Sequence, residues 1–273
     1  FPKYGINTTF VSGQNIAEWE QAIDKNTKAV FFETPSNPTL EIIDISAVSK
    51  IAKKVGAKVI IDNVFATPIL QKPLELGVDI VVYSGTKHID GQGRALGGAI
   101  ISDKEYYEKH LKPYMRHTGA SLSPFNAWIM LKGLETLKLR VEHQSDSALK
   151  LAEYYLNHSK IKKVIYPSQK THDQYNLIQS QMSKGGTLLT MILDGGKKEV
   201  FKMLNNLEII DISNNLGDTK SLITHPATTT HYSLGEEGRK EAGIPDGMIR
   251  LSVGLENPTD LIDDLDTALG KIK

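Results

Sequence analysis

The sequence predicts an α/β fold, with a mostly parallel sheet followed by a smaller α+β unit. Three apolar runs predict the strands of that sheet, at 29–32, 59–61 and 78–82. Helical patterns separate them, and such alternation is typical of a parallel, doubly wound sheet with right-handed crossovers. We therefore expect a first domain at 1–136 and a second at 137–273.

The remaining elements of the first domain follow from caps, breakers and period. Short helices are expected at 15–23 and at 68–76, and Asp44 is a candidate N-cap for a helix that ends at Gly56. One further strand is expected at 97–101. A long helical pattern then runs from 123 to about 157, and we assign its lysines, arginines and glutamates to a solvated face.

The second half alternates strand-like and helix-like segments without a βαβ repeat. The strand-like segments are 164–166, 186–193, 209–212 and 248–253, and the helix-like ones are 197–206 and 260–269. This order favours an α+β unit.

Composition excludes several classes of function. Lysine and arginine total 32, as do aspartate and glutamate, so no net charge favours nucleic acid or an acidic membrane surface. There is no cysteine, which removes disulfides, thiolate catalysis and thiolate metal sites, and we expect no metal. We expect a cytoplasmic protein. The start at Phe1 reads like the middle of a domain, and it leaves open whether a targeting segment precedes it.

Polar residues follow three predicted strands, where ligands bind in α/β sheets. Asn37 lies in a loop with two prolines, Asp62 ends the second strand, and Ser84, Thr86 and Lys87 follow the third. A lysine amine forms Schiff bases with aldehydes, and a buried aspartate can keep a pyridine nitrogen protonated. The hydroxyls suit a phosphate monoester and Asn37 suits a phenolic oxygen. Together these groups predict a site for pyridoxal 5'-phosphate (PLP).

Each of these residues has a simpler interpretation when taken alone. A lysine beside glycines is usually a solvated surface residue, Ser-Gly-Thr is usually a turn, and an aspartate after a strand is usually a cap. Their position at successive strand ends is what favours the cofactor site. The glycines from Gly91 to Gly98 do not form the G-x-G-x-x-G turn of a dinucleotide site.

The second half adds a candidate anion site. Arg250 interrupts an apolar strand, and a guanidinium there either reaches water or pairs with an anion such as an amino acid carboxylate. Asn215, in a polar loop, is a second candidate donor, although a turn is its default role. We interpret His225 and His231 as structural residues, because their spacing does not indicate a metal pair.

The chain resembles the cystathionine γ-synthase family of PLP-dependent enzymes, also called the Cys/Met metabolism family. The matching segments occur in the family's order at 33–38, 61–63, 84–87, 96–98, 216–218, 225–227 and 249–256. The resemblance implies the type I, aspartate-aminotransferase-like fold and a homo-oligomer, a dimer of dimers with shared active sites.

The resemblance also assigns roles to these residues. Lys87 would hold the cofactor, Asp62 its ring nitrogen, Ser84 and Thr86 its phosphate, and Asn37 its phenolic oxygen. Arg250 and the Asn215 loop would bind the substrate α-carboxylate.

Within the family, the segments 62–68, 88–94 and 121–128 are most similar to the sulfhydrylases that act on O-succinylhomoserine. The implied reaction joins that amino acid ester and sulfide to give homocysteine and succinate in methionine biosynthesis. Arg94 and Arg116, beside family pocket segments, are candidates for the distal succinyl carboxylate. Cystathionine γ-synthase, O-acetylhomoserine sulfhydrylase and methionine γ-lyase activities stay open.

Two features depart from the family pattern. Gly85 replaces the more usual alanine, and the family's N-terminal arm, with a tyrosine and an arginine that reach the neighbouring subunit's cofactor, does not appear before Phe1. We therefore expect the large domain to be N-terminally incomplete. A catalytically silent fragment that serves as a binding module is the alternative from another class.

Overall fold

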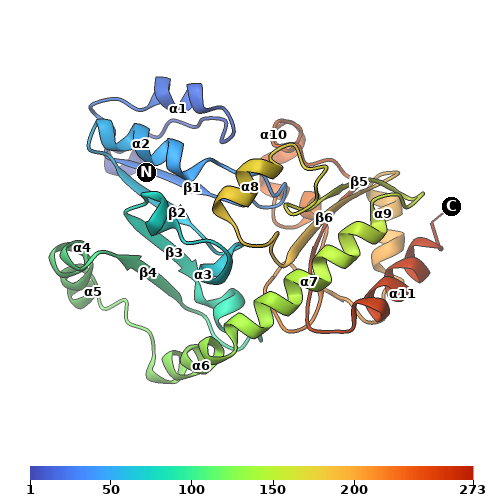
Figure 1. Cartoon of the computed structure of the whole chain (residues 1–273). Helices are drawn as coiled ribbons and strands as arrows, with labels where there is room; N and C mark the ends of the chain where they lie inside the picture. Colours follow the sequence, from blue (N-terminus) through green and yellow to red (C-terminus); the bar gives the residue numbers. More distant parts are fainter. Residues whose placement is uncertain (273) are drawn as a thin grey trace.

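The computed structural model, which describes residues 1–272, contains two sheets that lie side by side (Figure 1). The first sheet has the order β1 (Ala29–Glu33), β2 (Lys58–Asp62), β3 (Ile80–Ser84) and β4 (Gly98–Ser102). The first three strands are parallel and β4 is antiparallel to β3. The carboxyl ends of β1, β2 and β3 therefore meet at one edge, as the sequence predicts.

Consecutive strands are neighbours in this sheet, so the expected doubly wound arrangement is wrong for the strands described. A doubly wound sheet requires the strand order to reverse at a switch point. Here α1 (Ile16–Ala22) and α2 (Ile45–Lys54) pack over one core. The carboxylate of Asp44 caps α2 by accepting a hydrogen bond from the Ala47 amide at 2.8 Å.

Two predicted helices are each interrupted. The helix expected at 68–76 is α3 (Thr67–Leu70) followed by a short 3-10 turn, η2 (Pro73–Leu76), because a proline disfavours helical backbone in the residue before it. The long helix expected from 123 breaks at Thr136 into α6 (Pro124–Glu135) and α7 (Leu137–Tyr155).

The buried face of α6 leaves out several of the large apolar side chains of this helix. Trp128, Leu131 and Leu134 are exposed, whereas Gly133 is buried. A side-chain carbon added at Gly133 would lie 2.0 Å from the carbonyl oxygen of Ile89. This close approach directs the glycine face of α6 toward the protein.

The second sheet has the order β5-β6-β9-β8-β7. Its strands are β5 (Ile161–Ile165), β6 (Leu188–Leu193), β7 (Asp211–Ile212), β8 (Leu222–Thr224) and β9 (Met248–Ser252). α7, α9 (Lys197–Leu204) and α11 (Pro258–Leu269) contribute to one apolar core with it. The strand β8 is not apparent from the sequence pattern.

Shorter elements complete the described chain. They are η1 (Pro2–Tyr4), η3 (Gly85–Ile89), α4 (Lys104–Tyr106), η4 (Tyr107–Leu111), α5 (Lys112–Thr118), α8 (Tyr175–Gln181), η5 (Pro226–Thr228), η6 (Tyr232–Leu234) and α10 (Gly235–Glu241). Within residues 1–272, no helix combines the length and the apolar character that a bilayer span requires.

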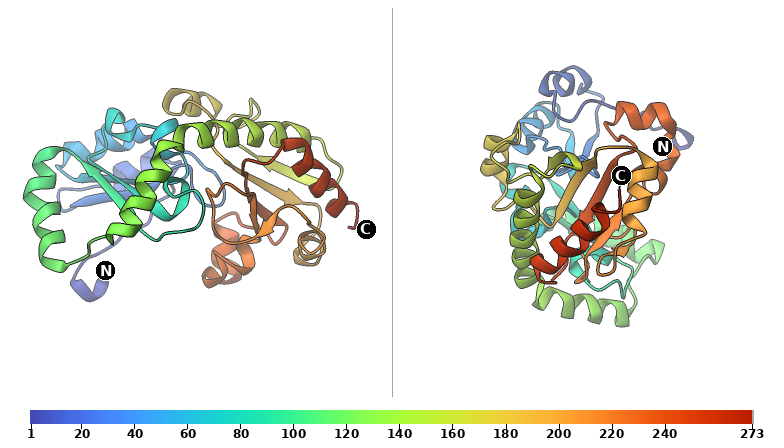
Figure 2. Two further views of the ribbon diagram at one scale, coloured as in Figure 1. Left: turned by 90° about the horizontal axis from the view of Figure 1, so that it is seen from below. Right: turned by 90° about the vertical axis from the view of Figure 1, so that its right-hand side faces the viewer.

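The helix α7 connects the two sheets. It contacts η3 beside the first sheet and also β5 and β6 of the second. Figure 2 shows it, in yellow-green, running along one side of the molecule from the first sheet to the second. The domain division at 136 stays a prediction, and it falls at the break that begins this helix.

Candidate active site

Two carboxylates lie next to each other where β1 and β2 end. Parallel register pairs Glu33 with Asp62. The Oδ1 atom of Asp62 accepts a hydrogen bond from the Val64 amide at 2.9 Å, and burial raises the pKa of Asp62. Burial, and then the charge of Asp62, raise the pKa of Glu33 to about 7. Both acids therefore need a nearby positive charge to ionise easily.

Lys87 lies in η3, the single helical turn that follows β3 directly. Its backbone departs from helical geometry, with φ −87° and ψ −125°. Its Nζ donates a hydrogen bond to Oδ1 of Asn215, which belongs to the loop between β7 and β8. Burial, and then the nearby charge of Arg250, lower the pKa of the Lys87 amine. This favours the neutral, nucleophilic form.

Two hydroxyls flank that turn. The Oγ1 of Thr86 accepts a hydrogen bond from the Gly97 amide at 3.3 Å, which leaves its own hydrogen available to donate. The half-buried Ser84 hydroxyl has no hydrogen-bond partner within the part of the chain that the structure describes. Both hydroxyls can therefore donate to an oxygen-rich ligand.

Arg250 belongs to β9 in the second sheet and is only 1% exposed. Its Nη1 donates to Oδ1 of Asn37 at 2.8 Å, and its Nη2 donates to the carbonyl oxygens of Asn214 at 3.0 Å and Asn215 at 3.3 Å. Among residues 1–272 its Nε has no partner and no carboxylate pairs with it. Burial lowers its pKa to about 10, whereas Glu33 acts in the opposite direction. A buried cation in this state favours an anionic ligand.

The structure thus brings together most of the residues that the sequence predicts. The loop after β1, the end of β2, η3, the β7–β8 loop and β9 converge. The predicted residues in this cluster are Asn37, Asp62, Ser84, Thr86, Lys87, Asn215 and Arg250.

Arg94 and Arg116 are placed differently. The Nε of Arg94 donates to Oδ1 of Asp90 at 2.9 Å and its Nη2 donates to the Asp90 carbonyl at 3.0 Å. Arg116 is exposed on α5, which Figure 1 shows at the outer edge of the molecule beyond β4. The structure therefore does not bring Arg116 to the cluster, and Arg94 is held by a carboxylate of its own segment.

Sequence reasoning missed three residues of this region. Glu33 has no role of its own in the sequence pattern, but the structure places it in register with Asp62. His88 is buried, with its Nε2 2.7 Å from Oγ1 of Thr187, and burial lowers its pKa to about 3, so the ring is neutral. Arg140 was assigned to a solvated face but is 6% exposed. Its place between Leu137 and Val141 on the apolar stripe of α7 was the available signal.

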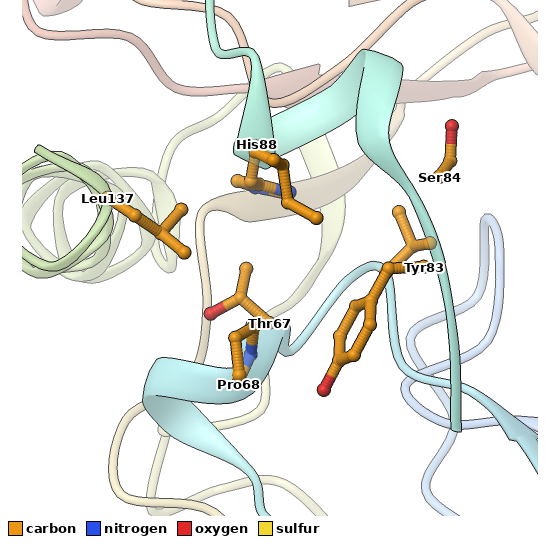
Figure 3. Close-up of a pocket in the computed structure, with 8 residues that line it drawn as sticks. Thr67, Pro68, Tyr83, Ser84, His88 and Leu137 are labelled. Atoms are coloured by element: carbon orange, nitrogen blue, oxygen red, sulfur yellow. The ribbon is translucent and has the colours of Figure 1, made fainter. Parts of the chain in front are cut away.

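A small cavity lies between η3 and α3 (Figure 3). Its volume of about 10 Å³ is room for about one water molecule. Thr67, Tyr83, His88 and Leu137 are among its lining residues. The cavity is much too small for a cofactor, so the cluster around Lys87 is the candidate site.

The chemistry of this cluster fits PLP. An amine with a lowered pKa is available for its aldehyde, and a buried carboxylate is available for its pyridine nitrogen. Unpaired hydroxyl hydrogens on Ser84 and Thr86 suit its phosphate. The side-chain nitrogen of Asn37 stays free to donate, because its Oδ1 accepts from Arg250. The residues present therefore match the functional groups of this cofactor.

The raised pKa of Glu33 makes a testable prediction. Folded Glu33 holds a proton up to about pH 7, whereas a glutamate in the unfolded chain loses it near the ordinary value of 4.5. The free energy of unfolding of the cofactor-free protein should therefore fall as pH rises between those values, by about 3 kcal/mol from this group. Glu33→Gln, measured by urea denaturation at several pH values, should remove that part of the fall.

The matched control is Glu105→Gln, at an exposed position on α4, which should keep the wild-type dependence. Parallel pH curves for wild type and Glu33→Gln would contradict the assignment.

Comparison with known proteins shows the family to which the chain belongs. Residues 1–270 match the family model for the Cys/Met metabolism PLP-dependent enzymes. The chain is 54% identical to the O-succinylhomoserine sulfhydrylase of Mycobacterium tuberculosis, covering 98% of this chain and 67% of that protein. It is 43% identical to the corresponding enzyme of Pseudomonas aeruginosa (100% and 67%) and to an L-methionine gamma-lyase of Fusobacterium nucleatum (99% and 69%).

Solved structures agree with this placement. The cystathionine gamma-lyase of Lactobacillus plantarum, complexed with L-serine, superposes with a TM-score of 0.95 at 33% identity, covering 99% of this chain and 71% of that one. The metB protein of Corynebacterium glutamicum gives 0.92 at 34% identity, covering 97% and 68%. The fold is therefore that of the type I PLP-dependent enzymes, and the chain belongs to the Cys/Met metabolism family of PLP-dependent enzymes.

Proposed function

We propose that the protein catalyses γ-replacement, in which O-succinyl-L-homoserine and sulfide give homocysteine and succinate. The observation that carries this proposal is the 54% identity to a protein named O-succinylhomoserine sulfhydrylase, which spans nearly the whole chain. The geometry around Lys87 supports it, because the groups that such a reaction needs converge there.

The cofactor, when bound, supplies an electron sink that makes the substrate Cα–H bond acidic. Lys87 is the group that we assign to hold it. Asp62 would face its ring nitrogen, Ser84 and Thr86 its phosphate, and the side-chain nitrogen of Asn37 its phenolic oxygen. The raised pKa of Asp62 indicates how strongly this carboxylate would gain from a cationic partner.

Lys87 is also the proposed base. Its amine has a lowered pKa, which favours the neutral form of Nζ, the form that can accept the proton from the substrate Cα. After releasing that proton, the same nitrogen can accept a proton from Cβ while the Cγ–O bond to succinate breaks, and sulfide then forms the new C–S bond at Cγ. Asn215 holds Nζ through its Oδ1 on the side of the second sheet.

Arg250 is the proposed site of the substrate carboxylate. Its guanidinium is buried and lacks a carboxylate partner within residues 1–272, and its Nε has no acceptor. A bidentate pair with the substrate would satisfy it and would fix the direction of the Cα–H bond. For the distal succinyl carboxylate we retain Arg94 as a candidate, because one of its terminal nitrogens makes no described contact; nothing further in the structure supports Arg116.

Methionine γ-lyase activity is the second candidate, because a relative of that name is 43% identical over nearly the whole chain. An asparagine at position 215, where the γ-lyases tend to have serine, weakly favours the sulfhydrylase.

The test is identification of products from the full-length protein. O-succinyl-L-homoserine with sulfide should give homocysteine and succinate in equal amounts. Cysteine in place of sulfide should give little cystathionine, and methionine alone should give little 2-oxobutanoate. Rapid release of 2-oxobutanoate from methionine, without homocysteine formation from the ester, would contradict the proposal and favour the lyase.

The matched control for this assay is Lys87→Ala. Loss of the base and of the cofactor-holding amine should lower turnover about a thousandfold or more. Full turnover by Lys87→Ala would overturn the assignment of Lys87 whichever products are found.

We also propose that the protein is a cytoplasmic homo-oligomer. Contiguous apolar side chains on α6 support an interface with a second copy: Phe125 is 66% exposed, Trp128 56% and Leu131 58%. Exposing several large apolar side chains on one face of a helix to water is unfavourable.

The oligomer makes a separate prediction. Leu131→Glu, which places a charge in the α6 face, should lower the molar mass measured by sedimentation equilibrium to that of a smaller species. The control is Lys54→Glu, at an exposed position on α2. An unchanged mass for Leu131→Glu would contradict the assignment of this face.

A further inference from the structure

Arg140 makes an unusual set of contacts. Its Nη1 donates to the carbonyl oxygen of His88 at 2.9 Å, and its Nη2 donates to the carbonyl oxygens of Gly133 at 2.8 Å and Ile89 at 3.5 Å. Its Nε donates to Oγ1 of Thr136 at 3.1 Å. Every nitrogen of this buried guanidinium therefore donates a hydrogen bond, and three of the acceptors are main-chain carbonyls.

Two of those carbonyls end the turn that carries Lys87. His88 and Ile89 are the last residues of η3, so no further helical turn supplies amide donors for their carbonyl oxygens. The guanidinium donates to these oxygens instead. Within residues 1–272 no carboxylate hydrogen-bonds to Arg140. The buried carboxylates of Asp90 and Asp218 act on it only through space, and they oppose the effect of burial on its pKa.

The chain is shaped to admit this guanidinium. Gly91 has φ +70°, and a side-chain carbon added there would lie 2.2 Å from Nη1 of Arg140. The Gly91 amide donates to the carbonyl oxygen of Lys87 at 2.8 Å. A shift of Gly91 would therefore act directly on the backbone of Lys87 through this hydrogen bond.

The same helix also holds the opposite side of the site. Gln144, one turn after Arg140 on α7, donates through its Nε2 to the carbonyl oxygens of Asp218 at 2.7 Å and Val253 at 2.9 Å. Asp218 ends the polar loop that contains Asn215, the partner of Lys87. One face of α7 therefore contacts both segments that meet at the Lys87 amine.

We propose that Arg140 is a positioning residue that fixes η3 against α7 and so aims the Lys87 amine at the Asn215 side of the site. This inference rests on the proposed role of Lys87, but its contacts are independent of the substrate. Burying a guanidinium is costly unless its donors are satisfied, and here satisfaction comes from the backbone of the segment that it positions.

The test uses the full-length protein, freed of cofactor, and two readouts other than activity. Hydrogen exchange reports on the amides of Asp90 and Gly91, which donate to the carbonyl oxygens of Gly85 and Lys87. The pH dependence of lysine labelling, followed by mass spectrometry, reports the pKa of Lys87.

Arg140→Met keeps an unbranched, flexible side chain but removes the guanidinium and with it every donor. We expect exchange at Asp90 and Gly91 to accelerate about tenfold or more, because charge-assisted bonds to the end of η3 are lost. The labelling midpoint of Lys87 should move upward, since a loosened turn is less buried. Lys150→Met, at an exposed position on α7, is the control and should leave both readouts unchanged.

Gly91→Ala adds the opposing test, because it displaces the guanidinium without removing it. Its effect on exchange should be smaller in the Arg140→Met background, where the clash is absent. Thr136→Val, which removes only the acceptor of Nε, should change exchange in the same direction by a smaller factor and serves if Arg140→Met does not fold.

Two results would overturn the proposal: unchanged exchange at Asp90 and Gly91, or an equal acceleration in α11, which would mean general loss of stability. Fully additive effects of Gly91→Ala and Arg140→Met would also count against it. Turnover by Lys87→Ala would instead refute the proposed function. The hydrogen-exchange results would still test whether Arg140 positions η3.

Discussion

The site depends on contacts that cross from one sheet to the other. The amine of Lys87, which follows β3, donates to Asn215 beside the second sheet, and Arg250 on β9 donates to Asn37 in the loop after β1. Neither pair exists unless the two sheets keep their relative placement. The long helix α7, which contacts η3 as well as β5 and β6, is the element that links them. The geometry of the candidate site therefore depends on the relative placement of the two sheets.

Charge burial explains the shifted pKa values of the cluster. Two acids at adjacent strand ends have raised pKa values, and the lysine and arginine of the same cluster have lowered ones. Each group is removed from water without a close partner of opposite charge, a pattern that is typical of functional sites. A ligand that carries a cationic ring, a phosphate and a carboxylate would relieve all of them at once. Without that ligand the cluster is costly to stability.

The sequence predicted the first sheet, its parallel strands and the convergence of most of the candidate site residues, because apolar runs that end in polar residues are a local signal. It did not predict the break at Thr136 or the orientation of α6. Those depend on the approach of Gly133 to Ile89, a contact between distant segments. The same limit applies to Arg140, whose burial requires a glycine at position 91 and the free carbonyls of η3. The prediction of a doubly wound sheet was wrong for the strands described, because strand order depends on packing and not on the period of the apolar residues.

The proposed chemistry of the site requires that Lys87 holds the cofactor. The most direct measurement is reduction of the full-length protein with borohydride in the presence of PLP, followed by proteolysis and mass spectrometry of every lysine peptide. We expect stoichiometric labelling at Lys87 and none in Lys87→Arg. Labelling of another lysine in place of Lys87, or a protein that takes up no cofactor, would contradict it.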